Sequence, residues 1–98
     1  MYEKGEVISI ITTVGELVGK LVEQNSEVVV LEKPRMVMHN SEGMGFAAGV
    51  CLSGEEGPEK VEFVRDNVVF LQKTNKDVEK AWLTFTSGIQ LATTGSIA

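Results

Sequence analysis

Two β-forming runs separated by a short polar break constrain most strongly how this chain can fold. Residues 61–64 read Val-Glu-Phe-Val, residues 65–67 read Arg-Asp-Asn, and residues 68–71 read Val-Val-Phe-Leu. β-branched and aromatic residues favour strands, so this pattern predicts strand, tight turn, strand. A strand of a small antiparallel domain is usually apolar on one face, yet residues 68–71 are apolar throughout. We therefore expect a helix or a second copy of the protein to cover the outer face of this last strand.

The preceding sequence predicts further strands at residues 6–14, 17–24, 27–32 and 46–52. Gly19 inside the second of them indicates a bulge or sharp bend. The third is expected to break at Lys33 and Pro34, because proline cannot donate to a strand ladder, and to resume at residues 35–39. Residues 40–45 are predicted to form a turn and residues 53–59 an acidic, solvated loop.

A single helix is predicted at about residues 75–87. Thr74 and Asp77 have the spacing of a capping box, and Val78, Trp82 and Phe85 form an apolar stripe. Residues 89–98 are expected to be a loose tail. The chain therefore predicts a single domain over residues 1–98, a small and strongly bent barrel over about residues 6–73 with the helix across one open end.

Composition narrows the class of protein. A chain of 98 residues suits one domain, and no apolar run approaches the roughly 20 residues that span a bilayer. The net charge of −5 opposes loose binding to nucleic acid, although Lys33 with Arg35 is a candidate local basic patch. Cys51 is the single cysteine, which fits a reducing compartment, so we expect a cytoplasmic protein without a membrane partner.

Two segments resemble the motifs of the Sm and Sm-like (LSm, Hfq) superfamily. Residues 14–21, Val-Gly-Glu-Leu-Val-Gly-Lys-Leu, are similar to the first Sm motif, with its turn glycine and bend glycine. Residues 64–68, Val-Arg-Asp-Asn-Val, are similar to the second motif. The resemblance covers about residues 6–73. More narrowly, the chain resembles Sm-like proteins of phage, with cyanophage as one candidate origin, which would place it in the cytoplasm of the infected host cell.

The resemblance implies a five-stranded, SH3-like barrel with an extended hairpin between its third and fourth strands. It also implies a homo-oligomeric ring of roughly five to seven subunits, in which the fourth strand of one pairs with the fifth of the next. Single-stranded RNA is the ligand it implies. Arg65 and Asn67 match RNA-binding positions, and Asn25 matches one by neighbourhood only. The usual N-terminal helix is missing, and the C-terminal helix is expected to take its place.

The chain also departs from the family pattern. Arg65 is followed directly by Asp66, where the family has glycine, and valine stands where the base-contacting asparagine would lie. Arg65 could instead pair with Asp66 or with a carboxylate of a neighbouring subunit and fix the turn. A ring that serves as a scaffold or protein-interaction module, with the RNA surface lost, is therefore the alternative function. A monomeric SH3-like adaptor is a third.

No residues are predicted to be catalytic, and we expect neither enzyme activity, nor a cofactor, nor a metal. His39 has no partner at ligand spacing and is expected to be a solvated turn residue. Cys51 is expected to be a packed, inert thiol. Trp82 could stack on a base, but its spacing favours burial against the barrel.

Overall fold

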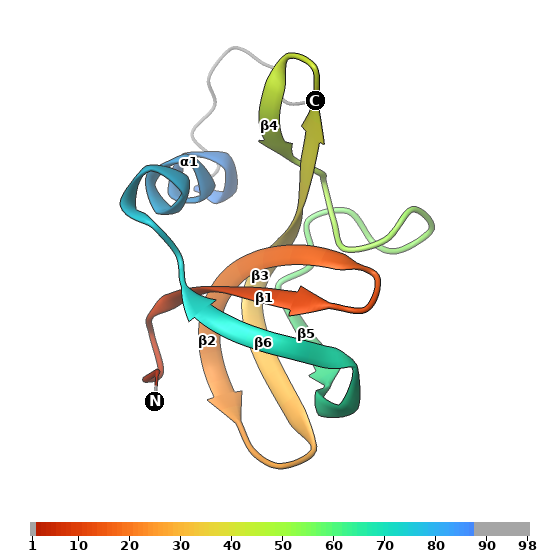
Figure 1. Ribbon diagram of the computed structural model, residues 1–98, viewed down its shortest axis with the longest axis vertical. Helices are drawn as coiled ribbons and strands as arrows, with labels where there is room; N and C mark the ends of the chain where they lie inside the picture. The colour runs from red at the N-terminus through yellow and green to blue at the C-terminus, as the bar shows by residue number, and fades with distance from the viewer. Residues whose placement is uncertain (1, 88–98) are drawn as a thin grey trace.

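The computed structural model describes residues 2–87, which form an antiparallel sheet followed by one helix (Figure 1). The elements in chain order are β1 (Val7–Thr12), β2 (Gly15–Gln24), β3 (Val28–Asn40), β4 (Gly43–Phe46), β5 (Lys60–Val64), the 3-10 turn η1 (Arg65–Asn67), β6 (Val68–Lys73) and α1 (Lys76–Thr86). The predicted mainly β class and the predicted helix after the strands are both confirmed. The described residues contain six strands, whereas the family resemblance implied five.

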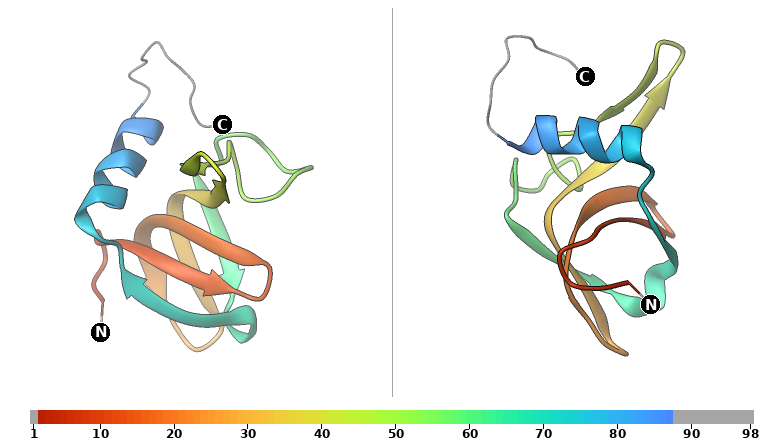
Figure 2. Two further views of the ribbon diagram at one scale, coloured as in Figure 1. Left: turned by 45° about the horizontal axis from the view of Figure 1, so that its top comes forward. Right: turned by 90° about the vertical axis from the view of Figure 1, so that its left-hand side faces the viewer.

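The sheet runs in the order β5, β3, β2, β1, β6, and β4 pairs with the far half of β3. β3 changes partner along its length, because Val28–Glu32 pairs with β5 whereas Val37–Asn40 pairs with β4. The second half of β3 and β4 therefore form the predicted hairpin, which projects away from the rest of the sheet (Figures 1 and 2). Within residues 2–87, β5 and β6 do not pair with each other, so the predicted barrel is not closed.

The main core lies on the concave side of the curved sheet. Its buried members come from three strands: Ile8, Ile10, Leu17, Leu21, Val29 and Leu31. Phe63 of β5 and Leu71 of β6 pack against this cluster, and so does Tyr2 from the segment before β1. Alternation along β1 and β2 directs Val7 and Val18 to the opposite face, where they form a second cluster with Phe46 and Trp82.

The helix α1 belongs to this second cluster. Trp82 is 2% exposed and packs with Val7 and Val18, so its predicted burial is confirmed. The helix therefore covers part of the sheet face opposite the main core, rather than an open end of a barrel. The predicted cap is also wrong by one residue: Asn75 accepts the N–H of Val78 at 2.9 Å, whereas Thr74 is buried and shares a hydrogen bond with Ser9. The tail predicted at 89–98 lies outside the described residues.

The middle of the chain differs most from the sequence prediction. β3 is continuous through Pro34, because the chain bends there instead of breaking, with Lys33 at a φ of 52°. The amide of Lys33 donates to the carbonyl of Glu59 at 2.7 Å, one residue beyond the last pair of β3 with β5, Glu32 with Lys60. The strand predicted at 46–52 is absent: β4 begins earlier, at Gly43, and ends at Phe46. The Asn40 side chain accepts the N–H of Glu42 in the turn before it.

Gly19 marks a bulge, as predicted. The register between β2 and β3 shifts between Val18 and Lys20. A Cβ atom at Gly19 would lie 3.1 Å from both the Leu31 Cβ and the Pro34 Cα, which is closer than side chains normally approach. Glycine at this position lets β2 curve tightly across the bent part of β3.

A bulge in β6 explains its uninterrupted apolar run. Successive residues Ile11 and Thr12 of β1 pair with Phe70 and Val68, so β6 carries one extra residue at Val69. This insertion lets both Val68 and Leu71 pack on the main core although they are three residues apart. Val69 and Phe70 remain 64% and 50% exposed, so α1 does not provide the cover that the sequence led us to expect.

Candidate nucleic-acid interface at two adjoining turns

The turn between β2 and β3 is built by one side chain. Asn25 is exposed, and its Oδ1 accepts the backbone N–H groups of Glu27 at 2.7 Å and of Val28 at 2.9 Å. The amide of Asn25 in turn donates to the carbonyl of Val28 at 3.0 Å. This Asx-type arrangement fixes the reversal and engages the oxygen of the Asn25 side chain. Its Nδ2 group is the part of Asn25 that can serve a ligand.

The turn η1 lies directly beside this first turn. The backbone N–H of Arg65 donates to the carbonyl of Glu27 at 2.8 Å, which continues the pairing of β5 with β3 into the two turns. At the other end of η1, the carbonyl of Asn67 accepts the N–H of Thr13 at 3.0 Å, in the turn between β1 and β2. The short polar triplet is thus fastened on both sides by backbone hydrogen bonds.

The Arg65 side chain bridges the two turns. Its Nη1 donates to the Oε1 of Gln24 at 2.9 Å, and the Nε2 of Gln24 donates to the carbonyl of Tyr2 at 3.5 Å. A guanidinium carries five N–H donors, and the bond to Gln24 uses one. Within residues 2–87 the recorded ion pair is Lys73 with Glu6 at 3.9 Å, so Arg65 does not pair with Asp66 as one alternative held.

The three predicted RNA-binding residues are only partly brought together. Arg65 and Asn25 come from adjoining turns, which the sequence places 40 positions apart. Asn67 instead lines a separate recess of about 230 Å³ with Thr13 and Val14, and Arg65 is not among the residues that line it. The exposed carboxylates of Glu27 and Asp66 belong to the same turns as Arg65 and oppose the approach of phosphate.

Sequence reasoning missed Gln24 and misassigned Arg35, which lies at the bend of β3 rather than at the two turns. Gln24 accepts a hydrogen bond from Arg65 and orients it. The position of Gln24 directly before Asn25 is the signal in the sequence that could have identified it. Arg35, assigned to a surface patch with Lys33, is 7% exposed, and its Nη1 donates to the carbonyls of Pro34 at 2.8 Å and Pro58 at 3.3 Å. Burial lowers the pKa of the Arg35 guanidinium, and the carboxylate of Glu59 acts in the opposite direction. Arg35 thus fastens the loop after β4 and cannot serve a surface ligand.

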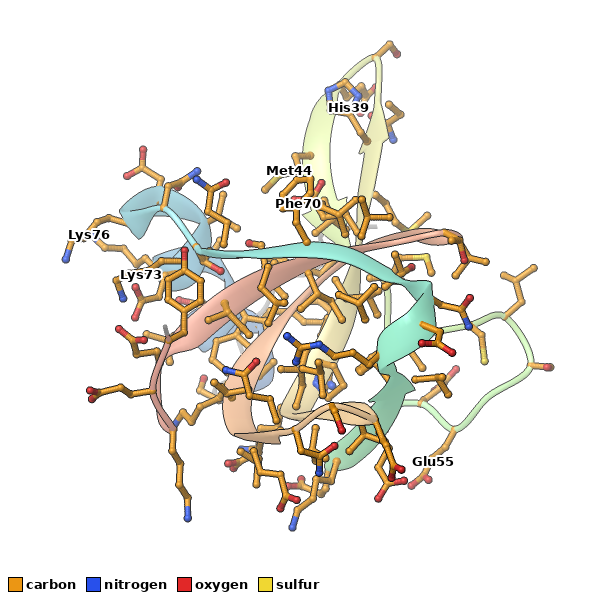
Figure 3. All side chains as sticks on the ribbon, turned by 60° about the horizontal axis from the view of Figure 1, so that its bottom comes forward. His39, Met44, Glu55, Phe70, Lys73 and Lys76 are labelled. Carbon is orange, nitrogen blue, oxygen red and sulfur yellow. The ribbon has the colours of Figure 1, made fainter. Side chains whose placement is uncertain are left out.

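The other singled-out residues lie elsewhere. His39 is exposed near the end of β3, in the projecting hairpin, and Glu55 lies in the loop that follows β4 (Figure 3). Cys51 is exposed, so its predicted packing is wrong; the strand that would have buried it does not form. Among the described side chains, no group of three or more His, Cys, Asp or Glu could hold a metal ion.

The sequence matches no model of a known protein family, and it matches no curated protein. In the described part of the chain, no helix is long and apolar enough to cross a membrane. The assignment of a function therefore depends on the geometry of this chain and on its motif resemblance.

Proposed function

We propose that this protein assembles into a closed, Sm-like ring that binds single-stranded RNA, without enzymatic activity. The observation that carries the proposal is that β5 and β6 are the two edge strands of the sheet. Within residues 2–87, β5 pairs only with β3 and β6 only with β1, so each has one unsatisfied edge. Such edges are an aggregation hazard unless another chain pairs with them.

The two edges differ, and this difference favours a ring over a simple dimer. When β5 of one copy pairs with β6 of the next, the contact is heterologous, and repeating it closes a ring if the rotation allows. Exposed apolar side chains stand on both strands: Val64 on β5, and Val69 and Phe70 on β6. Burying them between copies would supply the cover that α1 does not provide.

The mass of the purified protein in solution tests the assembly. Light scattering should give a multiple of the 10.6 kDa chain, and Phe70→Asp should lower the mass towards one chain, because a carboxylate would be buried at the contact. Leu83→Asp on α1 is the matched control, since Leu83 is 46% exposed against 50% for Phe70. A single-chain mass for the unmodified protein would contradict the ring, and an unchanged mass for Phe70→Asp would contradict the role of β6.

RNA binding is proposed at the two adjoining turns, with Arg65 as the principal residue and Asn25 beside it. Arg65→Ala should weaken binding of short U-rich or A-rich RNA at low salt by at least about tenfold, the effect of losing one charge-assisted contact. Fluorescence anisotropy measures the affinity, and Lys60→Ala on β5 controls for the loss of one positive charge. Equal affinities for the unmodified protein and Arg65→Ala would remove Arg65 from the interface.

A scaffold ring without RNA is the second candidate, and specific contacts favour it. The Arg65 guanidinium is already engaged by Gln24, the Asn25 oxygen is used within its own turn, and Glu27 and Asp66 lie in the same two turns. The ratio of absorbance at 260 and 280 nm distinguishes the candidates. A nucleic-acid-free ring that also fails to bind added RNA supports the scaffold.

A further inference from the structure

A groove lies between the projecting hairpin and the helix, away from the two turns. One wall is β4 and the other is a face of α1 (Figure 1). The lining residues are Met44, Gly45, Phe46, Asp77, Lys80, Ala81, Thr84 and Phe85. The groove has a volume of about 530 Å³. Sites for small molecules typically measure about 300–1,000 Å³, so the size of this groove suits a small ligand.

The apolar part of the groove is formed by side chains from both walls. Phe46 of β4 is 4% exposed and contacts Phe85 of α1, with ring centroids 5.7 Å apart and planes at 39°. Met44 and Phe85 are 46% and 38% exposed. Aromatic side chains favour tilted or offset contacts with a further aromatic group, and the thioether of methionine also contacts such groups favourably. Met44 and Phe85 can therefore receive an aromatic group from a ligand.

The polar part of the groove belongs to α1 alone. Asp77, Lys80 and Thr84 are exposed and follow one another at intervals of three and four residues, so they lie on one face of the helix. Asp77 and Lys80 are separated by a rise of about 4.5 Å along the axis. Within residues 2–87 the recorded ion pair is Lys73 with Glu6, so Asp77 and Lys80 do not pair with each other. A carboxylate and an ammonium are thus both available to a ligand.

This pair of opposite charges determines which ligands the groove can favour. A simple anion attracted by Lys80 would be repelled by Asp77 one helical turn away, and a simple cation would meet the reverse conflict. A free α-amino acid carries an ammonium and a carboxylate on the same carbon atom, so the two groups can face neighbouring charges on one helix face. Within a peptide these groups are converted into amide bonds. The groove therefore fits a single amino acid better than an internal peptide segment.

We propose that this groove binds a free amino acid with an aromatic side chain. The ammonium of the ligand faces the carboxylate of Asp77, and its carboxylate accepts hydrogen bonds from the Lys80 ammonium and the Thr84 hydroxyl. The aromatic group of the ligand packs against Met44 and Phe85. The site is independent of the proposed assembly and of the RNA surface, because no residue of β5, β6 or the two turns lines the groove.

Titration of the full chain with L-phenylalanine, followed by NMR, tests the site. The backbone amides of Gly45 and Ala81 should shift saturably, with a dissociation constant on the order of 1 mM, because an open groove offers a small ligand few contacts. Three analogues each lack one feature: L-alanine lacks the aromatic group, N-acetyl-L-phenylalanine lacks the ammonium and L-phenylalaninamide lacks the carboxylate. Each should bind at least about threefold more weakly. The absence of a saturable shift up to about 10 mM L-phenylalanine, or equal binding of any one analogue, would overturn the proposal.

Variants of α1 test the two charges separately. Asp77→Asn and Lys80→Gln should each weaken binding of L-phenylalanine by about threefold, the effect of losing one exposed charge contact. Glu79→Gln is the matched control for Asp77, since both acids lie in the first turn of α1 but Glu79 does not line the groove. Lys76→Gln is the control for Lys80, because Lys76 lies well away from Met44 (Figure 3). Both controls should bind like the unmodified protein, and equal affinities across all four variants would overturn the proposal.

Discussion

At the scale of single residues, the bend of β3 depends on one indole. Lys33 adopts a left-handed backbone conformation that side-chain-bearing residues rarely favour. The Nε1 of Trp82 donates to the Lys33 carbonyl at 3.0 Å, across 49 positions of sequence. Trp82 therefore holds the backbone at the point where β3 leaves the sheet and enters the hairpin.

We expect Trp82→Phe to lower the free energy of unfolding by about 2 kcal/mol, through a lost hydrogen bond and a partly filled cavity. Urea denaturation followed by circular dichroism measures it, since the only tryptophan is removed. Leu83→Ala, on the exposed side of the same helix, should change stability by less than about 0.5 kcal/mol. Similar losses in both variants would contradict the proposed role of Trp82.

At the scale of elements, the sequence predicts best where periodicity and turn chemistry agree. The boundaries of β5, η1 and β6 follow from the β-branched runs around Arg-Asp-Asn, and α1 follows from the stripe that contains Trp82. The strand predicted at 46–52 fails because the residues after Phe46 bond within a loop, where the N–H of Gly57 donates to the carbonyl of Ala48 at 2.7 Å. Local propensity cannot reveal this contact, because it depends on how the whole loop closes.

The candidate site could be predicted only in part, because its geometry depends on contacts between different elements. Arg65 and Asn25 could be singled out by position, but their junction depends on the backbone bond from Arg65 to Glu27 and on Gln24. Likewise, the burial of Arg35 depends on the loop that brings the Pro58 carbonyl to it. These contacts join segments far apart in the chain, and neither composition nor spacing carries information about them.

At the scale of the whole molecule, the proposed assembly should be visible in the thermal stability. If ring contacts bury the β5 and β6 edges, the folded state is stabilised by mass action. The melting temperature of the unmodified protein should then rise by about 5 °C for each tenfold increase in concentration. Scanning calorimetry measures this dependence. Phe70→Asp should melt at a temperature that does not vary with concentration, and a flat dependence in the unmodified protein would argue against the ring.

The pairing of β6 with β1 also determines when the protein can finish folding during synthesis. β1 leaves the ribosome well before its second partner, which is complete only at Lys73, and the indole that anchors Lys33 comes later still. An emerging chain therefore leaves one edge of β1 unpaired, and the bend of β3 without its hydrogen bond from Trp82, until nearly all described residues have been translated. Nascent chains that end before Trp82 should consequently be more susceptible to proteases, and more dependent on chaperones, than chains that extend beyond it.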